Sequence, residues 1–235
     1  MGRKARSHHE SRVTSRESRE TAFRARLLRW FRRHGRDLPW RRTRDPYEVL
    51  VSEVMLQQTQ VSRVEEYYPR FLAAFPTIRD LAHAPPRAVR EQWDGLGYYR
   101  RAANLHALAQ RVVEDHDGVI PGDRDSLRSL PGVGRYTAGA VLTFAYEHSE
   151  PAVDTNVGRV IRRAFHPRAK KDARGDNRVW DTAKRLVPRA GSSAWTFNQA
   201  IMELGALVCT ARVAKCGICP VKPACTTGGR EDGRK

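Results

Sequence analysis

The chain has 235 residues, of which 40% are hydrophobic, so it is long enough to bury a substantial core in one domain or two small ones. Its 43 Lys and Arg residues outnumber its 26 Asp and Glu residues, and this excess favours a polyanionic partner, nucleic acid before membrane. No stretch approaches the roughly 20 apolar residues that span a bilayer, and the N-terminal sequence lacks the apolar core of a signal peptide. We therefore expect a cytoplasmic, nucleoid-associated protein rather than a membrane protein.

Residues 1–21 are rich in Arg, Ser, Glu and His without hydrophobic periodicity, so we expect them to form a disordered basic arm. Helical periodicity begins in FRARLLRWFRR, where Phe23, Leu27, Trp30 and Phe31 share one face. It continues, between prolines and glycines, in PYEVLVSEVMLQQ, VSRVEEYYPRFLAAF, AVREQWDGL, RRAANLHALAQRVVEDH and YTAGAVLTFAY. The sequence contains neither the alternation typical of paired strands nor a repeat of fixed period. The predicted fold class is all-α.

The cysteines of the chain all lie within its last 27 residues, as Cys209, Cys216, Cys219 and Cys225 in the spacing C-x6-C-x2-C-x5-C. A cytoplasmic protein rarely uses disulfides, so this pattern predicts metal ligation by thiolates. Tetrahedral zinc and an iron–sulfur cluster both suit four thiolates. Zinc ribbons usually combine two C-x2-C pairs, whereas this loop has one pair and two longer spacings. The spacing therefore favours a 4Fe-4S cluster and leaves zinc as the alternative.

Residues 130–141 read LPGVGRYTAGAV, a glycine turn that opens a helix. The backbone N–H groups of such a turn and of a helix N-terminus can bind a phosphate oxygen. Gly132 and Gly134 would let the phosphate approach the backbone closely, and Arg135 adds a positive charge. An ordinary turn between two helices would use the same glycines. In a basic chain with a metal-binding loop, the stretch indicates a helix-hairpin-helix anchor for DNA.

Several motifs follow one another in a characteristic order. They are LPW at 38–40, SEVMLQQTQV at 52–61, GLGYYRRAANLH at 95–106, LPGVGRYTAGAV at 130–141, VDTNVGRV at 153–160, FNQAIMELGALVC at 197–209 and the four-cysteine loop. Over about residues 22–226 the chain resembles the MutY-type adenine DNA glycosylases, members of the helix-hairpin-helix superfamily that also contains endonuclease III. The resemblance implies a monomeric base-excision repair enzyme. Its implied substrate is double-stranded DNA in which adenine is mispaired with 8-oxoguanine or guanine.

The resemblance also implies a domain organisation. A six-helix domain with the helix-hairpin-helix is expected over residues 38–148. Residues 22–37 and 149–226 are expected to form a helical domain that carries the 4Fe-4S cluster, and residues 227–235 a tail. Members of the family usually carry a further C-terminal Nudix-like domain that helps to recognise 8-oxoguanine, whereas this sequence stops about ten residues after Cys225.

Cleavage of an N-glycosidic bond builds positive charge on the sugar and negative charge on the leaving base, so it needs an acid near the base and a carboxylate near the sugar. Glu53 lies in an otherwise apolar helix, where burial would raise its pKa, although a glutamate within a helix is more often a solvated surface residue. The resemblance assigns Glu53 to protonation of adenine N7. It assigns Asp154 to stabilisation of the oxocarbenium ion or transient attack on C1′, and Asn156 to the sugar and phosphate. A plain helix N-cap is the alternative role for Asp154.

Tyr136 stands where endonuclease III carries a lysine, whose amine forms a Schiff base and allows strand cleavage. A phenol cannot form that bond. The resemblance therefore implies a monofunctional glycosylase, in which Tyr136 positions Asp154 or the sugar. Simple packing of the ring in the first turn of the helix is the structural alternative.

An adenine inside a duplex must be flipped out to reach a buried acid. The resemblance implies that Gln57 and Gln58 fill the gap and contact the orphaned partner base, and that Tyr98 wedges beside that base. It implies that Gln199 bonds the edge of the flipped adenine, although the residue alone would suggest a polar side chain at the border of the core. Arg41, beside the LPW motif, is expected to contact DNA.

One departure and two alternatives remain. Thr155 stands where the family commonly has glycine, and a threonine at this position resembles endonuclease III. Glycosylases that remove thymine or uracil from T·G and U·G mismatches share the fold, the cluster and a tyrosine at position 136, but they usually lack an intact SEVMLQQTQV motif. A non-catalytic DNA-binding protein with a cluster would have no need of Glu53 in an apolar helix. The sequence thus favours removal of adenine over both alternatives.

Overall fold

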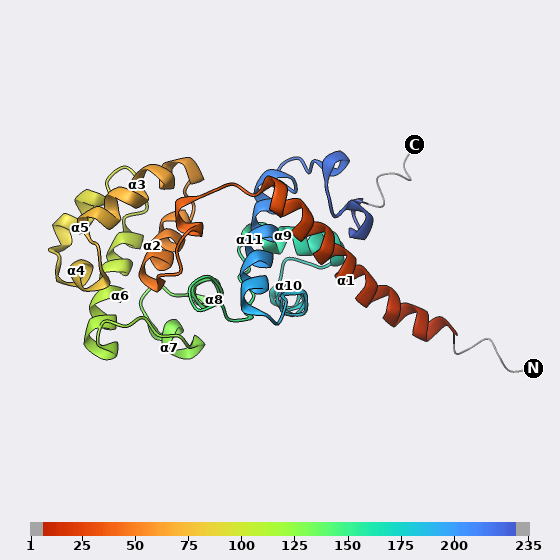
Figure 1. Ribbon diagram of the computed structural model, residues 1–235, viewed down its shortest axis with the longest axis horizontal. Coiled ribbons are helices and arrows are strands. Elements are labelled where there is room, and N and C mark those ends of the chain that lie inside the picture. The colour runs from red at the N-terminus through yellow and green to blue at the C-terminus, as the bar shows by residue number, and fades with distance from the viewer. Residues whose placement is uncertain (1–6, 229–235) are drawn as a thin grey trace, which may run out of the picture. The chain divides into compact units, whose positions relative to one another are not determined.

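The computed structural model describes the backbone of residues 7–228 and side chains from residue 17 onward. Within these residues the chain is all-α, as its periodicity predicts, with eleven α-helices, three 3-10 helices and an isolated antiparallel bridge between Cys209 and Ala214 (Figure 1). None of the helices described is both long enough and apolar enough to cross a membrane. The chain forms two compact units, which we call the middle unit (residues 37–152) and the terminal unit (residues 1–36 and 153–235).

The middle unit begins with a 3-10 helix and continues with seven α-helices, one more than the six expected. They are η1 (Pro39–Arg41), α2 (Pro46–Leu56), α3 (Val61–Ala74), α4 (Ile78–His83), α5 (Pro86–Gln92), α6 (Arg100–His116), α7 (Arg124–Ser129) and α8 (Arg135–Phe144). Helices α4 and α7 have six residues each, which is too short for a helical period to show in the sequence. Their caps define them instead: the Thr77 side chain accepts from the N–H of Asp80 in a capping box, and Asp123 accepts from the N–H of Ser126.

Helix α2 runs through the interior of the middle unit, where it packs against α3, α6 and α8 (Figure 1). Pro46 occupies its first turn, and the Asp45 side chain caps it by accepting from the N–H groups of Tyr47 at 2.8 Å and Glu48 at 3.0 Å. Every residue from position 49 to position 55 is buried. A helix that is apolar around its whole circumference is stable only in the interior. This burial carries Glu53 into the core.

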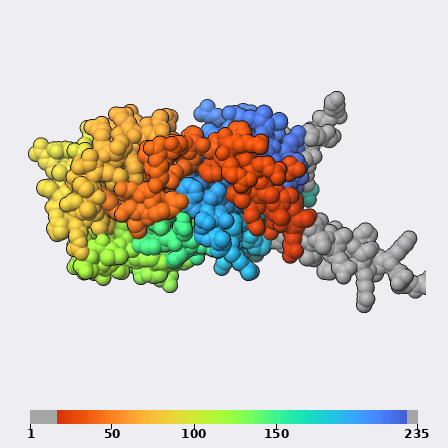
Figure 2. Space-filling view, in the orientation of Figure 1, coloured from red at the N-terminus to blue at the C-terminus, as the bar shows by residue number. Residues whose placement is uncertain are grey.

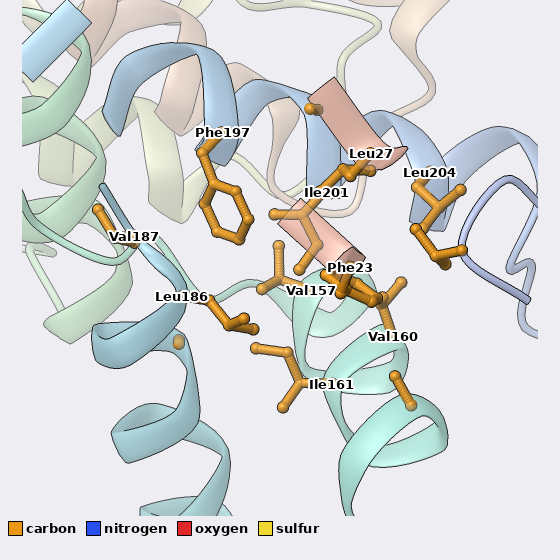
Figure 3. Packing of buried hydrophobic residues seen from close by; sticks show 14 of the residues in the cluster. Phe23, Leu27, Val157, Val160, Ile161, Leu186, Val187, Phe197, Ile201 and Leu204 are labelled. Carbon is orange, nitrogen blue, oxygen red and sulfur yellow. The ribbon is translucent and has the colours of Figure 1, made fainter. Parts of the chain in front are cut away.

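The terminal unit joins the first helix of the chain to its last ones. It contains α1 (Ser7–His34), α9 (Thr155–Phe165), α10 (Ala173–Leu186), α11 (Gly191–Leu207), η2 (Cys216–Ile218) and η3 (Lys222–Ala224). Side chains from the four α-helices point toward one another in a single core, which includes Phe23 and Leu27 of α1, Ile161 of α9 and Ile201 of α11 (Figure 3). In the space-filling view the red surface of α1 borders the blue surface of residues that follow α11 (Figure 2).

The structure differs from the disordered arm expected for residues 1–21, because α1 already begins at Ser7. The end of that segment is held by contacts within the terminal unit. Arg19 donates to Thr226 Oγ1 at 3.1 Å, and Glu20, which is 8% exposed, accepts from Arg185 at 3.2 Å. Residues 1–6 lie outside the described residues, as does the expected tail from residue 229 onward.

Candidate active site and cysteine-lined cavity

The structure brings two predicted catalytic residues of the middle unit into contact. Glu53 is 5% exposed within α2, and the hydroxyl of Tyr136, at the start of α8, donates to Glu53 Oε2 at 2.5 Å. The motifs predict that Tyr136 positions Asp154 or the sugar, and they do not predict this partner, which lies 83 positions away. The carboxyl group of Glu53 is thus held in one orientation among buried side chains of α2.

The predicted DNA anchor is a turn between α7 and α8. Gly132 has φ +76°, a conformation that favours glycine, and a Cβ there would make a tight contact of 3.1 Å with Cβ of Asn104. Gly134 is the N-cap of α8 and offers no side chain to it, and no atom lies within 4 Å of where its Cβ would be. Arg135 is exposed in the first turn of α8. The start of this helix is thus accessible at the surface, as an anion site requires.

The residues expected to enter the duplex lie on two loops of the middle unit. Gln57 ends α2, and Gln58 follows it with φ +56°. Tyr98 has φ +50° and is 60% exposed. Arg101, for which the sequence predicts no role, is 9% exposed and donates to backbone oxygens of both loops, including those of Gln57 and Gly97. Arg101 stands inside the motif GLGYYRRAANLH, but nothing local distinguishes it from Arg100.

Two further predicted contacts lie in separate units. Gln199 belongs to α11 of the terminal unit and is 6% exposed, so it is buried rather than at a solvated surface. Arg41 ends η1 of the middle unit and is half-buried, and its backbone N–H donates to the carbonyl of Leu38 at 2.9 Å.

Asp154 is the N-cap of α9, which confirms the structural alternative given to it by the sequence. Its Oδ1 accepts from the N–H of Val157 at 2.7 Å, and its Oδ2 accepts from Nδ2 of Asn156 at 2.9 Å. Burial raises the pKa of Asp154, while these donors and the nearby guanidinium of Arg159 oppose part of that rise. Capping does not preclude catalysis, because the carboxylate is held in one orientation at the start of the helix.

Arg159, for which the sequence also predicts no role, extends this arrangement toward the cysteine loop. Its Nη2 donates to Asn156 Oδ1 at 2.7 Å and to the carbonyl of Gly205 at 2.8 Å, and its Nε donates to the carbonyl of Cys209 at 2.8 Å. Asn156 approaches Gly205 so closely that a Cβ on the glycine would lie 2.7 Å from Cβ of Asn156. The spacing of Asn156 and Arg159 by three residues on a helix is the only local signal for this contact.

The four cysteines line one cavity of about 250 Å³ in the terminal unit, and all four are free thiols. Nη1 of Arg163 lies 3.4 Å from Sγ of Cys209, and the N–H of Gly228 donates to Sγ of Cys225 at 3.4 Å. Burial raises the pKa of the Cys219 thiol, so a thiolate there needs a compensating cation. Among the described residues, no group of three or more His, Cys, Asp or Glu is arranged to hold a single metal ion. The cavity thus brings all four thiols of the loop to one place in the terminal unit.

Comparison with known proteins places these features in context. Residues 51–188 match the model of the HhH-GPD superfamily base excision DNA repair proteins. The chain is 49% identical over 196 residues to the adenine DNA glycosylase of Mycolicibacterium smegmatis, which covers 83% of this chain and 66% of that protein. It is 40% identical over 204 residues to the thymine/uracil-DNA glycosylase of Pyrobaculum aerophilum, which covers 86% of this chain and 89% of that protein. The chain thus spans about two thirds of its mycobacterial relative.

A solved structure of a thermostable thymine-DNA glycosylase has a TM-score of 0.85 to this chain at 30% identity, and the match covers 92% of this chain and 99% of that one. The residues of the family match include the hairpin of α7 and α8. The chain belongs to the HhH-GPD superfamily of base excision DNA repair proteins.

Proposed function

We propose that this chain is a monofunctional DNA glycosylase that hydrolyses the N-glycosidic bond of adenine mispaired with 8-oxoguanine or guanine. The observation that carries the proposal is the buried Glu53 with the Tyr136 hydroxyl at 2.5 Å. The greater identity to an adenine glycosylase than to a thymine/uracil glycosylase supports adenine as the base removed.

Glu53 is the general acid of this proposal. Its proton passes to adenine N7 as the bond from C1′ to N9 breaks, so the base leaves as a neutral molecule. The Tyr136 hydroxyl then donates to the carboxylate that remains, which stabilises the charge where water is excluded. Tyr136 in this role positions the acid and does not contact the sugar.

We assign Asp154 to the sugar. Its carboxylate stabilises the positive charge that develops at C1′ and takes up a proton from the water that adds there. The amide of Asn156 and the N–H of Val157 hold that carboxylate in place. Because position 136 offers a phenol and no amine, the products are free base and an abasic site on an unbroken strand.

The partner in this proposal is double-stranded DNA with a mismatched or damaged pair, bound by one copy of the chain. Gly132, Gly134 and Arg135 bind a phosphate at the start of α8, and the net charge of +17 supports such contacts. Gln57, Gln58 and Tyr98 fill the space left by the flipped base, a role supported by the 60% exposure of Tyr98. Gln199 bonds the flipped adenine, and Arg41 contacts the strand.

We further propose that Cys209, Cys216, Cys219 and Cys225 hold a 4Fe-4S cluster. Four thiolates around one zinc ion would each lie about 2.3 Å from a common point, whereas these cysteines line a cavity of about 250 Å³. When bound, the cluster supplies a cross-link that orders the loop after α11. Metal analysis of the purified protein should give about four iron atoms and four sulfides per chain and no zinc. One zinc and no iron would reject the cluster.

Removal of thymine or uracil from T·G and U·G mismatches is the second candidate, favoured by the relative that matches the chain over 89% of its own length. Duplexes with A·8-oxoguanine, A·G, T·G and U·G pairs, treated with hot alkali after incubation, report which base leaves. We expect alkali-dependent breaks at the adenine of the first two duplexes. Breaks confined to T·G and U·G duplexes would establish the second candidate, and binding without breaks in any duplex would indicate a non-catalytic protein.

A further inference from the structure

Arg101 is a buried cation whose partners are all neutral. It lies in the first turn of α6, and no ion pair of this residue occurs among the described residues. Burial lowers the pKa of Arg101. A charge taken out of water is costly unless hydrogen bonds compensate for it, so the acceptors that surround this guanidinium identify what it holds.

One nitrogen of the guanidinium caps α2. Nη1 donates to the carbonyls of Val54 at 3.0 Å, Met55 at 2.8 Å and Gln57 at 2.5 Å. The last four carbonyls of a helix lack partners within it and form the negative end of its dipole. Arg101 satisfies three of these four at the point where the chain leaves α2 and enters residues 57–60, which we call the Gln57 loop.

The other nitrogen joins a second loop to the first. Nη2 donates to Thr59 Oγ1 at 3.0 Å, to the carbonyl of Leu96 at 3.3 Å and to that of Gly97 at 3.1 Å. The guanidinium carbon also lies 5.5 Å from the centroid of the Tyr98 ring. We call residues 94–99 the Tyr98 loop. One planar group therefore contacts both loops and the ring that one of them presents.

Both loops contain a residue in a conformation that needs support. Gln58 has φ +56° and Tyr98 has φ +50°, backbone angles that residues other than glycine adopt at a cost in free energy. Such conformations persist where the surroundings fix them on several sides. Arg101 donates hydrogen bonds to residues directly beside Gln58 and Tyr98. Because the guanidinium is planar and rigid, these hydrogen bonds link the two loops.

We propose that Arg101 is a positioning residue that locks the Gln57 loop and the Tyr98 loop into one arrangement, so that both enter the duplex together. The inference rests on the proposed function of these loops in replacing the flipped base. Arg101 itself is too deeply buried for a base-specific contact. It acts through Tyr98 and the two glutamines.

The test compares Arg101→Lys with the matched control Arg100→Lys, since Arg100 is the exposed neighbour of Arg101. Lysine keeps the charge but has a single nitrogen, so it cannot donate to both loops as the two guanidinium nitrogens do. In the free protein, we expect faster hydrogen exchange in peptides that cover both loops for Arg101→Lys alone. With mismatched duplex, we expect its single-turnover base release to fall about 10-fold or more, while Arg100→Lys stays within about twofold of the parent.

Coupling to Tyr98 separates positioning from general destabilisation. If Arg101 acts through that ring, the variant with both Arg101→Lys and Tyr98→Ala should release base no more slowly than the worse single variant. Losses that multiply, or loop exchange unchanged in Arg101→Lys, would overturn the proposal.

A milder variant covers the case in which Arg101→Lys does not fold. Thr59→Val removes one acceptor from the guanidinium and should speed exchange in the Gln57 loop while the helical content stays that of the parent. Unchanged exchange in that loop would then overturn the proposal. If the parent releases no base from any duplex, the proposed function fails, and the exchange measurements in the free protein decide the role of Arg101 by themselves.

Discussion

Glu53 and Asp154 are both buried or half-buried carboxylates, but the chain surrounds them differently. Glu53 lies in the middle of α2, and the hydroxyl of Tyr136 donates to it. Asp154 lies at the start of α9 and accepts from the backbone N–H of Val157 and the amide of Asn156, with the Arg159 guanidinium nearby. Position along a helix accounts for the contrast, because only a helix start offers unpaired N–H groups.

The contrast suits the two roles that we propose for these carboxylates. A carboxyl group among apolar side chains retains a proton that it can donate, whereas one that accepts several hydrogen bonds is suited to remain charged beside a cation. Burial still raises the pKa of Asp154, so its charge depends on the donors around it. Substitutions that change the surroundings of either carboxylate should therefore have distinct consequences.

The largest effect is expected from Glu53→Gln. Glutamine keeps the size and the hydrogen bonding of the side chain but has no proton to transfer, so single-turnover base release should fall at least about 100-fold. Affinity for the mismatched duplex, measured by fluorescence anisotropy, should change little. A variant with the activity of the parent would show that Glu53 is not the acid.

A smaller loss is expected from Asn156→Ala, which removes a donor from Asp154. Loss of that hydrogen bond should raise the pKa of Asp154 further, because the donor favours the charged form. Base release near neutral pH should fall about 10-fold, and the acidic limb of the pH–rate profile should move to higher pH. Thr155→Ala, an exposed neighbour, is the control and should leave the profile in place. An unmoved limb in Asn156→Ala would refute the role of the amide.

A loss of about fivefold to tenfold is expected from Tyr136→Phe, which removes one hydroxyl donor and keeps the ring. Since the hydroxyl acts through Glu53, adding Tyr136→Phe to Glu53→Gln should cause no further loss of base release. A double variant that is slower than Glu53→Gln alone would indicate that Tyr136 acts on another group, such as the sugar.

The smallest effect, on stability, should have the opposite sign. The pKa of Asp154 is raised in the folded protein, so the ionised form is less favourable there than in the unfolded chain. The free energy of unfolding therefore falls as pH rises from the unfolded pKa to the folded pKa. Asp154→Asn should therefore unfold at a higher temperature than the parent near pH 7. Its free energy of unfolding should be larger by about 1.4 kcal/mol for each unit by which the folded and unfolded pKa values of Asp154 differ. The gain should vanish below about pH 4, where aspartate is protonated in both states. A variant less stable than the parent at pH 7 would contradict this account.

The sequence predicts much of this molecule because its helices have local signals. The apolar run of α2 and the glycines of the hairpin are visible in the order of residue types. The six-residue helices α4 and α7 are not visible in this way, because they are too short to show a helical period and their capping residues define where they begin. The helical residues before Phe23 were missed because contacts such as that of Arg19 with Thr226 join opposite ends of the chain.

The candidate site shows the same division. Motif resemblance names Glu53, Tyr136 and Asp154, but it does not pair Tyr136 with Glu53. Nor does it assign tasks to Arg101 and Arg159, whose partners include backbone carbonyls more than forty positions away. A carbonyl is the same in every residue, so its bond to a distant guanidinium leaves no trace in the residue types of the partner. Such contacts become visible only when the packing of the helices is known.

The most direct test of the central claim combines a change in the enzyme with a change in the substrate. Replacement of adenine by 7-deazaadenine opposite 8-oxoguanine removes the N7 acceptor, just as Glu53→Gln removes the donor. Single-turnover base release should be measured for the parent and for Glu53→Gln on both duplexes. We predict that each change alone slows release at least about 100-fold and that the two together slow it no further, because both break one proton transfer. Losses that multiply, or release of 7-deazaadenine by the parent at the rate of adenine, would contradict protonation of N7 by Glu53.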